Sequence, residues 1–283
     1  MDVRKVRPGA GAEWLLGGFV LLRRSPLGLG LLGAIFGVLA AAVALVATRS
    51  SQTFVVAELV MLLLGPLLVA GLVYAAREVD EGRAATPGQL LQGLREGKAS
   101  RLLATLLPQI GAALLIALLV VVVIGPDNMQ QMAQAMEKLQ GQANPDPELM
   151  RQIPAGRVLL LVFLAIVIGV GAGFFTFLAV PDMMFTEHGA FAAMGRSFRA
   201  CVNNVPALIV FYLLLMVSLV ALLFAVNIIG LVVRLLAGDQ AMQVVVQVLL
   251  MAVLMPVLTG AMYHAWKSLL GVGAPRPPTG IEV

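Results

Sequence analysis

The chain has 283 residues, of which 60% are hydrophobic and only 12% are charged, whereas soluble domains carry about 25% charged residues. This composition excludes a soluble globular fold, because the chain has far more apolar surface than such an interior could hold. The apolar runs are continuous rather than alternating, which favours membrane-spanning helices over strands. We therefore expect an all-α, polytopic membrane protein.

Six stretches are long enough to cross the membrane, which takes about 20 apolar residues for roughly 30 Å of hydrocarbon. They cover 27–47, 53–75, 102–124, 157–180, 205–233 and 243–265. The 26 residues before the first stretch contain acids as well as bases, a pattern too mixed for a cleavable signal peptide, so we expect the first span to be retained.

Lysine and arginine residues predict the orientation. Residues 1–26 and the loop 76–101 hold five each, and 14 of the 19 fall on the side of the two termini. The positive-inside rule therefore places both termini in the cytoplasm and the loop 125–156 outside. The net charge of +4 then reflects contact with anionic lipid headgroups, and we expect no nucleic acid partner.

The spans fall into an internal repeat. "PLLVAGLVYAAR" from Pro66 is similar to "PVLTGAMYHAWK" from Pro256, with a tyrosine within one residue of register and a final cation in both. We interpret the chain as three tandem units at about 10–77, 86–187 and 189–268, each an interfacial amphipathic helix followed by a two-span hairpin. They would form one membrane domain over 1–268, followed by a proline-rich, disordered tail at 269–283.

The helix before the fifth span shows the amphipathic pattern best. Phe191, Met194, Phe198 and Cys201 recur at spacings of three and four, which is one face of a helix, and the arginines lie opposite. Such helices lie in the headgroup plane with their cations on lipid phosphates. The candidate headgroup contacts are Arg23, Arg24, Arg95, Lys98, Arg196 and Arg199. The alternative is that these segments are plain linkers.

Two glycine pairs have the G-x-x-x-G spacing that lets helix backbones approach closely in a membrane. One is Gly33 and Gly37, and the other is Gly169 and Gly173.

No nucleophile elbow, zinc-protease helix or paired-cysteine motif is present in the sequence. We predict no catalytic residue, cofactor or metal site, and therefore no enzyme. The intramembrane polar candidates are Glu58, Asn227, Gln109 and Gln247. Hydrogen bonds between helices would explain the three amides. An acid inside a span is costly and often functional, but Glu58 lies near the external end of its span, so the alternative is an interfacial acid.

The segment "AAMGRSFRACVNNVPAL" resembles one found before spans in YciC-like bacterial inner-membrane proteins, and in the membrane domain attached to some glycerophosphodiester phosphodiesterases. The matching residues are Arg196, Ser197, Phe198 and Arg199. The resemblance implies a six-span protein of a bacterial inner membrane whose molecular function is uncharacterised, without an attached hydrolase.

Two functions remain open. The first is a non-enzymatic membrane protein that organises lipid or binds a membrane partner, which could be a second copy of the chain. The second is a small-molecule or lipid transporter or channel with a polar path near Glu58. The absence of an intramembrane charge cluster favours the first.

Overall fold

The structure is a computed structural model, and it describes residues 3–47, 51–126, 128–130, 132 and 154–271. The described residues form helices and no strand, which confirms the all-α class. Most of the predicted external loop and all but three residues of the predicted tail lie outside them.

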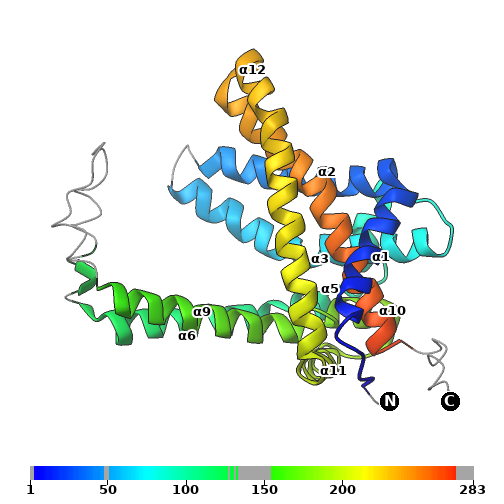
Figure 1. Ribbon diagram of the computed structural model, residues 1–283, viewed down its shortest axis with the longest axis horizontal. Coiled ribbons are helices and arrows are strands. Elements are labelled where there is room, and N and C mark those ends of the chain that lie inside the picture. The colour runs from blue at the N-terminus through cyan, green and yellow to red at the C-terminus, as the bar shows by residue number, and fades with distance from the viewer. Residues whose placement is uncertain (1–2, 48–50, 127, 131, 133–153, 272–283) are drawn as a thin grey trace, which may run out of the picture. The chain divides into compact units, whose positions relative to one another are not determined.

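The chain begins with three helices, continues with several short ones, and ends with a group that includes the long helices α9 and α12 (Figure 1). The first are α1 (Ala10–Arg24), α2 (Pro26–Ala47) and α3 (Ser51–Asp80). The next are η1 (Pro87–Leu91), α4 (Gln92–Arg95), α5 (Ala99–Leu103), α6 (Leu106–Leu119) and the π-helical η2 (Val120–Ile124). The last are α9 (Ala155–Thr176), α10 (Ala179–Phe185), α11 (Ala190–Asn203) and α12 (Val205–Leu269).

Five helical segments of the described chain are long and apolar enough to cross a membrane. They are Pro26–Val46, Gln52–Asp80, Ala99–Ile124, Ala155–Phe185 and Val205–Leu269. The last is interrupted at Gly238, whose φ of 85° and ψ of 179° are not helical, and Figure 1 shows α12 turning back on itself at its far end. It therefore consists of two helical arms, 205–237 and 239–269.

The described residues divide into two compact units, which we treat separately. Residues 106–174, with α6, η2 and most of α9, form one unit, and the rest of the chain forms the other. Both boundaries fall inside the predicted second repeat unit. Within the larger unit, α1, α2 and α3 pack on one another and on α12 around a core of buried leucines, including Leu21, Leu32 and Leu72.

Helix α1 lies between the two arms of α12, where its glycines allow backbone contact. A Cβ atom on Gly11 would stand 2.0 Å from the carbonyl oxygen of Ala207 in the first arm. A Cβ on Gly18 would stand 2.2 Å from the carbonyl oxygen of Val257 in the second arm. The predicted interfacial helix of the first unit is thus packed deeply against protein.

The predicted G-x-x-x-G contact of α2 is confirmed. A Cβ on Gly33 would lie 2.4 Å from the carbonyl oxygen of Met251, and one on Gly37 would lie 2.9 Å from the Cα of Val248. Within its own unit, the second pair has open space beside Gly169 and Gly173, so no close helix approach explains it there.

The segment expected to be the second interfacial helix forms three short helices, η1, α4 and α5. Thr86 is the N-cap residue of η1, and its backbone N–H donates to Oε1 of Gln89 at 3.0 Å. Gly97 lies two residues after the end of α4 and has a φ of 67°. This left-handed conformation favours glycine and separates α4 from α5.

Candidate functional site

Helices α3, α10 and α12 bring their C-terminal ends together within the larger unit, and aromatic rings fill the space between them. The ring of Phe185 at the end of α10 lies 5.8 Å from that of Tyr263 and 5.1 Å from that of Trp266, both on α12. The guanidinium of Arg77 on α3 lies 5.0 Å from the Phe185 ring centroid. α3 and the second arm of α12 correspond to the second and sixth predicted spans, whereas α10 begins where the predicted fourth span, 157–180, ends. We call this group the helix-end cluster; its members are Arg24, Arg77, Asp80, Asp182, Phe185, Thr186, His188, Arg196, Tyr263, Trp266 and Lys267.

Asp182 of α10 is the most deeply buried charge in the helix-end cluster, with no exposed surface. Its Oδ1 accepts a hydrogen bond of 3.0 Å from Nε1 of Trp266. Its Oδ2 lies 3.1 Å from Nδ1 of His188 and 3.4 Å from Nε of Arg196. Oδ2 and Nε of Arg196 are close enough for an ion pair, but they are not aligned for a hydrogen bond.

The contacts of His188 indicate which of its two ring nitrogens donates and which accepts. Nη1 of Arg196 can only donate, and it lies 3.1 Å from Nε2 of His188, so Nε2 accepts. Oγ1 of Thr186 donates to the carbonyl oxygen of Asp182 at 2.6 Å and lies 2.7 Å from Nδ1 of His188, so Nδ1 supplies the other hydrogen. The loop between α10 and α11 is therefore held by one connected polar network.

Asp80 forms a second acidic centre at the end of α3. Its Oδ2 accepts hydrogen bonds from the hydroxyl of Tyr263 at 3.0 Å and from Nζ of Lys267 at 2.8 Å. Nη1 of Arg24 lies 3.6 Å from its Oδ1. Asp80 therefore connects α3 with α1 and with the second arm of α12.

The carboxylates that follow Asp80 along the chain are also paired. Hydrogen bonds from Arg77 and Arg83 lower the pKa of Glu81 below its ordinary value. Partial burial raises the pKa of Glu96, but hydrogen bonds from Gln92 and Lys98 outweigh the burial and lower it overall. Both carboxylates are therefore ionised at neutral pH and neutralise neighbouring cations.

Comparison with known proteins gives no function for the helix-end cluster. No protein-family model, curated protein or solved structure matches the chain.

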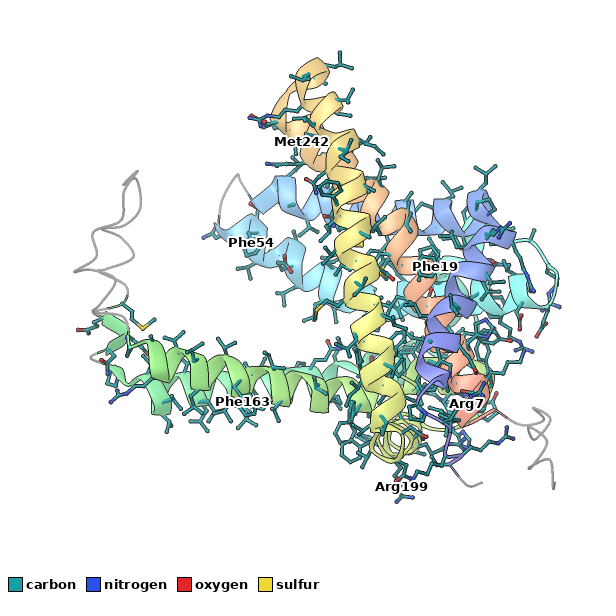
Figure 2. The ribbon with its side chains drawn as sticks, viewed as in Figure 1. Arg7, Phe19, Phe54, Phe163, Arg199 and Met242 are labelled. Carbon is teal, nitrogen blue, oxygen red and sulfur yellow. The ribbon has the colours of Figure 1, made fainter. Side chains whose placement is uncertain are left out.

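The four residues of the arginine-containing segment on α11 have separate roles. Arg196 contacts Asp182, and the hydroxyl of the buried Ser197 accepts a hydrogen bond of 3.0 Å from the backbone N–H of Leu178, where α9 gives way to α10. The ring of Phe198 stacks on that of Phe175 with centroids 4.5 Å apart. Arg199 alone of the four is exposed and lies on the outer side of α11 (Figure 2).

The structure divides the residues that the sequence placed on one apolar face of α11 between buried and exposed positions. The buried side chains are Ala193, Met194, Ser197, Ala200 and Cys201. Phe191, expected on the same face as Met194 and Cys201, is 74% exposed. Met194 and Cys201 therefore pack on protein, and the exposed face carries Phe191, Arg199 and Val202.

Burial also determines the chemistry of Cys201. It raises the pKa of the thiol to about 12, although a hydrogen bond with Ser197 acts in the opposite direction. The thiol is therefore protonated at neutral pH, and a protonated thiol is a poor nucleophile.

The other predicted headgroup contacts differ in their surroundings. Arg23 and Arg95 are exposed, and Arg24 is exposed but lies beside Asp80. Lys98 is mostly buried, and its Nζ donates to the carbonyl oxygen of Met184 at 2.8 Å. Lys98 and Arg196 thus make contacts inside the protein, whereas Arg23, Arg95 and Arg199 face outward.

The four predicted intramembrane polar residues are not brought together within the units. Glu58 and Asn227 are exposed on α3 and α12, and Gln247 is half-buried on the second arm of α12. The Nδ2 of Asn227 donates to the carbonyl oxygen of Leu223 in its own helix at 2.8 Å. Gln109 is exposed on α6 in the other unit. Among the described residues, no three acids, histidines or cysteines gather as a metal site.

The sequence interpretation did not single out Asp80, Asp182 or Trp266. The available signal was an acid close to the end of an apolar run: Asp80 follows such a run by four residues in "AAREVD", and Asp182 comes near the end of another in "AVPDMM". Such an acid at the end of a span is ordinarily exposed to water, and only the folded chain shows what surrounds it.

Proposed function

We propose that the chain is a six-span protein of a bacterial inner membrane, with both termini in the cytoplasm, that organises lipid or binds a membrane partner and catalyses no reaction. The observation that carries this proposal is the division of α11 into two faces. One face is locked onto protein by Arg196, Ser197 and Phe198, and the other presents Phe191 and Val202 beside Arg199. An exposed aromatic ring beside an exposed cation is typical of a helix at a membrane interface.

The two arms of α12 support six spans rather than five. Each arm exceeds 30 residues, and about 20 residues suffice to cross the hydrocarbon. Gly238 interrupts the helix close to the middle of α12. Counted separately, the arms are the fifth and sixth spans, and they form the third hairpin.

The helix-end cluster supports the three-unit arrangement. Its main contributors come from the ends of α3, α10 and α12, and the arms of a hairpin must return to the side from which they started. Arginine, lysine and acidic side chains gather there, whereas the rest of these helices expose mainly leucine, valine and phenylalanine. We place the helix-end cluster at the cytoplasmic surface, where the positive-inside rule puts the basic loops. The resemblance of the α11 segment to YciC-like proteins supports a bacterial inner membrane.

Hydrogen exchange of residues 190–203 in nanodiscs tests the lipid contact. We expect Arg199→Gln to lower protection about five-fold in anionic lipid, because one cation near such a surface contributes about 1 kcal/mol. The same loss is expected for the natural chain in neutral lipid. Lys5→Gln, which removes an exposed cation outside α11, should change nothing there. Equal protection in all samples would mean that α11 is held by protein alone, and the lipid proposal would fail.

Cysteine labelling tests the topology. Ser100→Cys lies on the proposed cytoplasmic side and Gln240→Cys on the proposed outer side, and both positions are exposed. With an impermeant thiol reagent on intact cells, we expect labelling at position 240 and none at position 100 until the cells are opened. The natural chain is the unlabelled control, because Cys201 is buried. Labelling of position 100 in intact cells would exclude the topology.

A further inference from the structure

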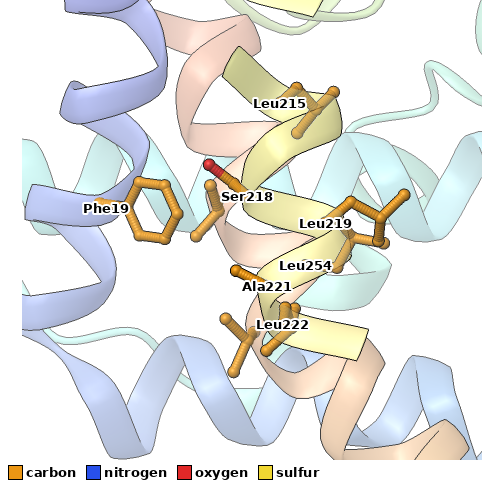
Figure 3. Close-up of a pocket in the computed structure, with 9 residues that line it drawn as sticks. Phe19, Leu215, Ser218, Leu219, Ala221, Leu222 and Leu254 are labelled. Atoms are coloured by element: carbon orange, nitrogen blue, oxygen red, sulfur yellow. The ribbon is translucent and has the colours of Figure 1, made fainter. Parts of the chain in front are cut away.

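A groove opens between α1 and the two arms of α12. Figure 3 shows the ring of Phe19 directed from α1 toward the first arm. The walls include Leu215, Leu219 and Leu222 of the first arm and Leu254 and Val257 of the second, and the volume is about 310 Å³. Ser218 is the one polar residue among the side chains that line it.

Close contacts at both ends of the arms explain why the groove exists. Near the turn, Gly230 allows contact between the arms, because a Cβ there would stand 2.5 Å from Cγ2 of Val246. At the other end, α1 separates the arms and touches one through Gly11 and the other through Gly18. Phe19 lies just beyond that contact, and the small side chains Ser218 and Ala221 leave the intervening space open.

The size and polarity of the groove match a hydrocarbon chain. An engineered apolar cavity of about 150 Å³ holds one benzene molecule, so twice that volume accommodates a chain of about a dozen carbon atoms. With a single hydroxyl in its wall, the groove offers almost nothing to a polar solute. In the proposed membrane setting, the apolar molecule present at high concentration is the bilayer lipid.

A cation stands beside the groove. Arg23 follows Phe19 by four residues, so the two side chains share one face of α1 about 6 Å apart at their Cβ atoms. Arg23 is exposed, and among the residues that the structure describes it has no carboxylate partner. Arg24, by contrast, lies beside Asp80. A lipid phosphate would supply the anion that Arg23 lacks.

We propose that the groove between α1 and the two arms of α12 binds one acyl chain of an anionic phospholipid, whose phosphate contacts Arg23. This inference rests on the proposed membrane insertion, but it concerns a single bound lipid rather than the headgroup layer beneath α11. The labelling and exchange experiments above do not involve the groove, so the two proposals fail separately.

Native mass spectrometry of the full chain, released from a mild detergent, tests the site. We expect the natural chain to retain one anionic phospholipid. Leu219→Trp fills the groove and should abolish retention. Val220→Trp places the same indole at the neighbouring exposed residue and should preserve retention. Arg23→Gln should weaken retention of anionic lipid about five-fold, whereas Lys5→Gln should leave it unchanged.

Three results would overturn the inference. One is an unchanged lipid count in Leu219→Trp. Another is a dimer that Leu219→Trp dissociates, because the occupant would then be a second copy of the chain. The third is equal retention of anionic and zwitterionic lipid, both by the natural chain and by Arg23→Gln. Because Arg23 is exposed, this last variant also decides the question if Leu219→Trp fails to fold.

Discussion

Asp182→Asn is expected to lower the free energy of unfolding by about 3 kcal/mol, because removing one partner of a buried ion pair leaves the other charge uncompensated. Asp182 has no exposed surface, and the Arg196 side chain beside it is only 19% exposed. The amide oxygen of asparagine can still accept the hydrogen bond from Trp266. The loss of stability would therefore come from the missing negative charge. In a thermal unfolding experiment in detergent, the midpoint should fall by roughly 6 °C or more.

Asp239→Asn is the matched control. Asp239 and Arg234 are closer, at 2.6 Å, but their side chains are 70% and 55% exposed. Exposed pairs contribute about 0–1 kcal/mol, so the midpoint should hardly move. Asp182→Asn combined with Arg196→Gln should cost less than the sum of the two single changes, because neither then leaves an unpaired charge. Equal effects of Asp182→Asn and Asp239→Asn on the thermal midpoint would show that the buried pair of Asp182 and Arg196 does not stabilise the fold.

The membrane class and the backbone contact at Gly33 and Gly37 could be predicted from the sequence, because both depend on local features. Long apolar runs determine the class directly. Small residues four apart create a flat helix face wherever they stand, although the open space beside Gly169 and Gly173 shows that the spacing alone does not produce a close contact. Both features are properties of one segment and need no knowledge of the rest of the chain.

The orientation of α11 could not be predicted, because hydrophobicity alone does not determine which face packs on protein. The pattern placed Phe191 on one face with Met194 and Cys201, but the small side chains of Ala193, Ser197 and Ala200 allow a different face of α11 to approach its neighbours closely. Phe191 loses little by facing outward where the surroundings are apolar as well.

Asp182 shows the same limit for the candidate site. Its partners His188 and Arg196 come from the following loop and helix, and Trp266 is 84 residues away. An acid after an apolar run gives no sign of whether water or three polar side chains will surround it. The spatial meeting of the three helix ends, rather than any motif, creates the helix-end cluster.

Gly18→Ala is expected to destabilise the chain by about 2 kcal/mol, although it adds only one methyl group. That methyl group would stand 2.2 Å from the carbonyl oxygen and 3.0 Å from the carbonyl carbon of Val257. These are backbone atoms, which cannot rotate away, and on the α12 side the contact is continued by Gly260. Overpacking of this kind costs about 1–3 kcal/mol, and the better helix propensity of alanine offsets up to about 1 kcal/mol of it.

Gly195→Ala separates these two contributions. Gly195 lies inside α11, and no atom would stand within 4 Å of a Cβ at that position. Only the propensity gain remains there, so the same substitution should stabilise the chain by about 1 kcal/mol. The thermal midpoints of the two variants should therefore move in opposite directions from that of the natural chain. A rise in both would show that α1 is not held between the arms of α12, and the groove beside Phe19 would lose the helix that forms one of its walls.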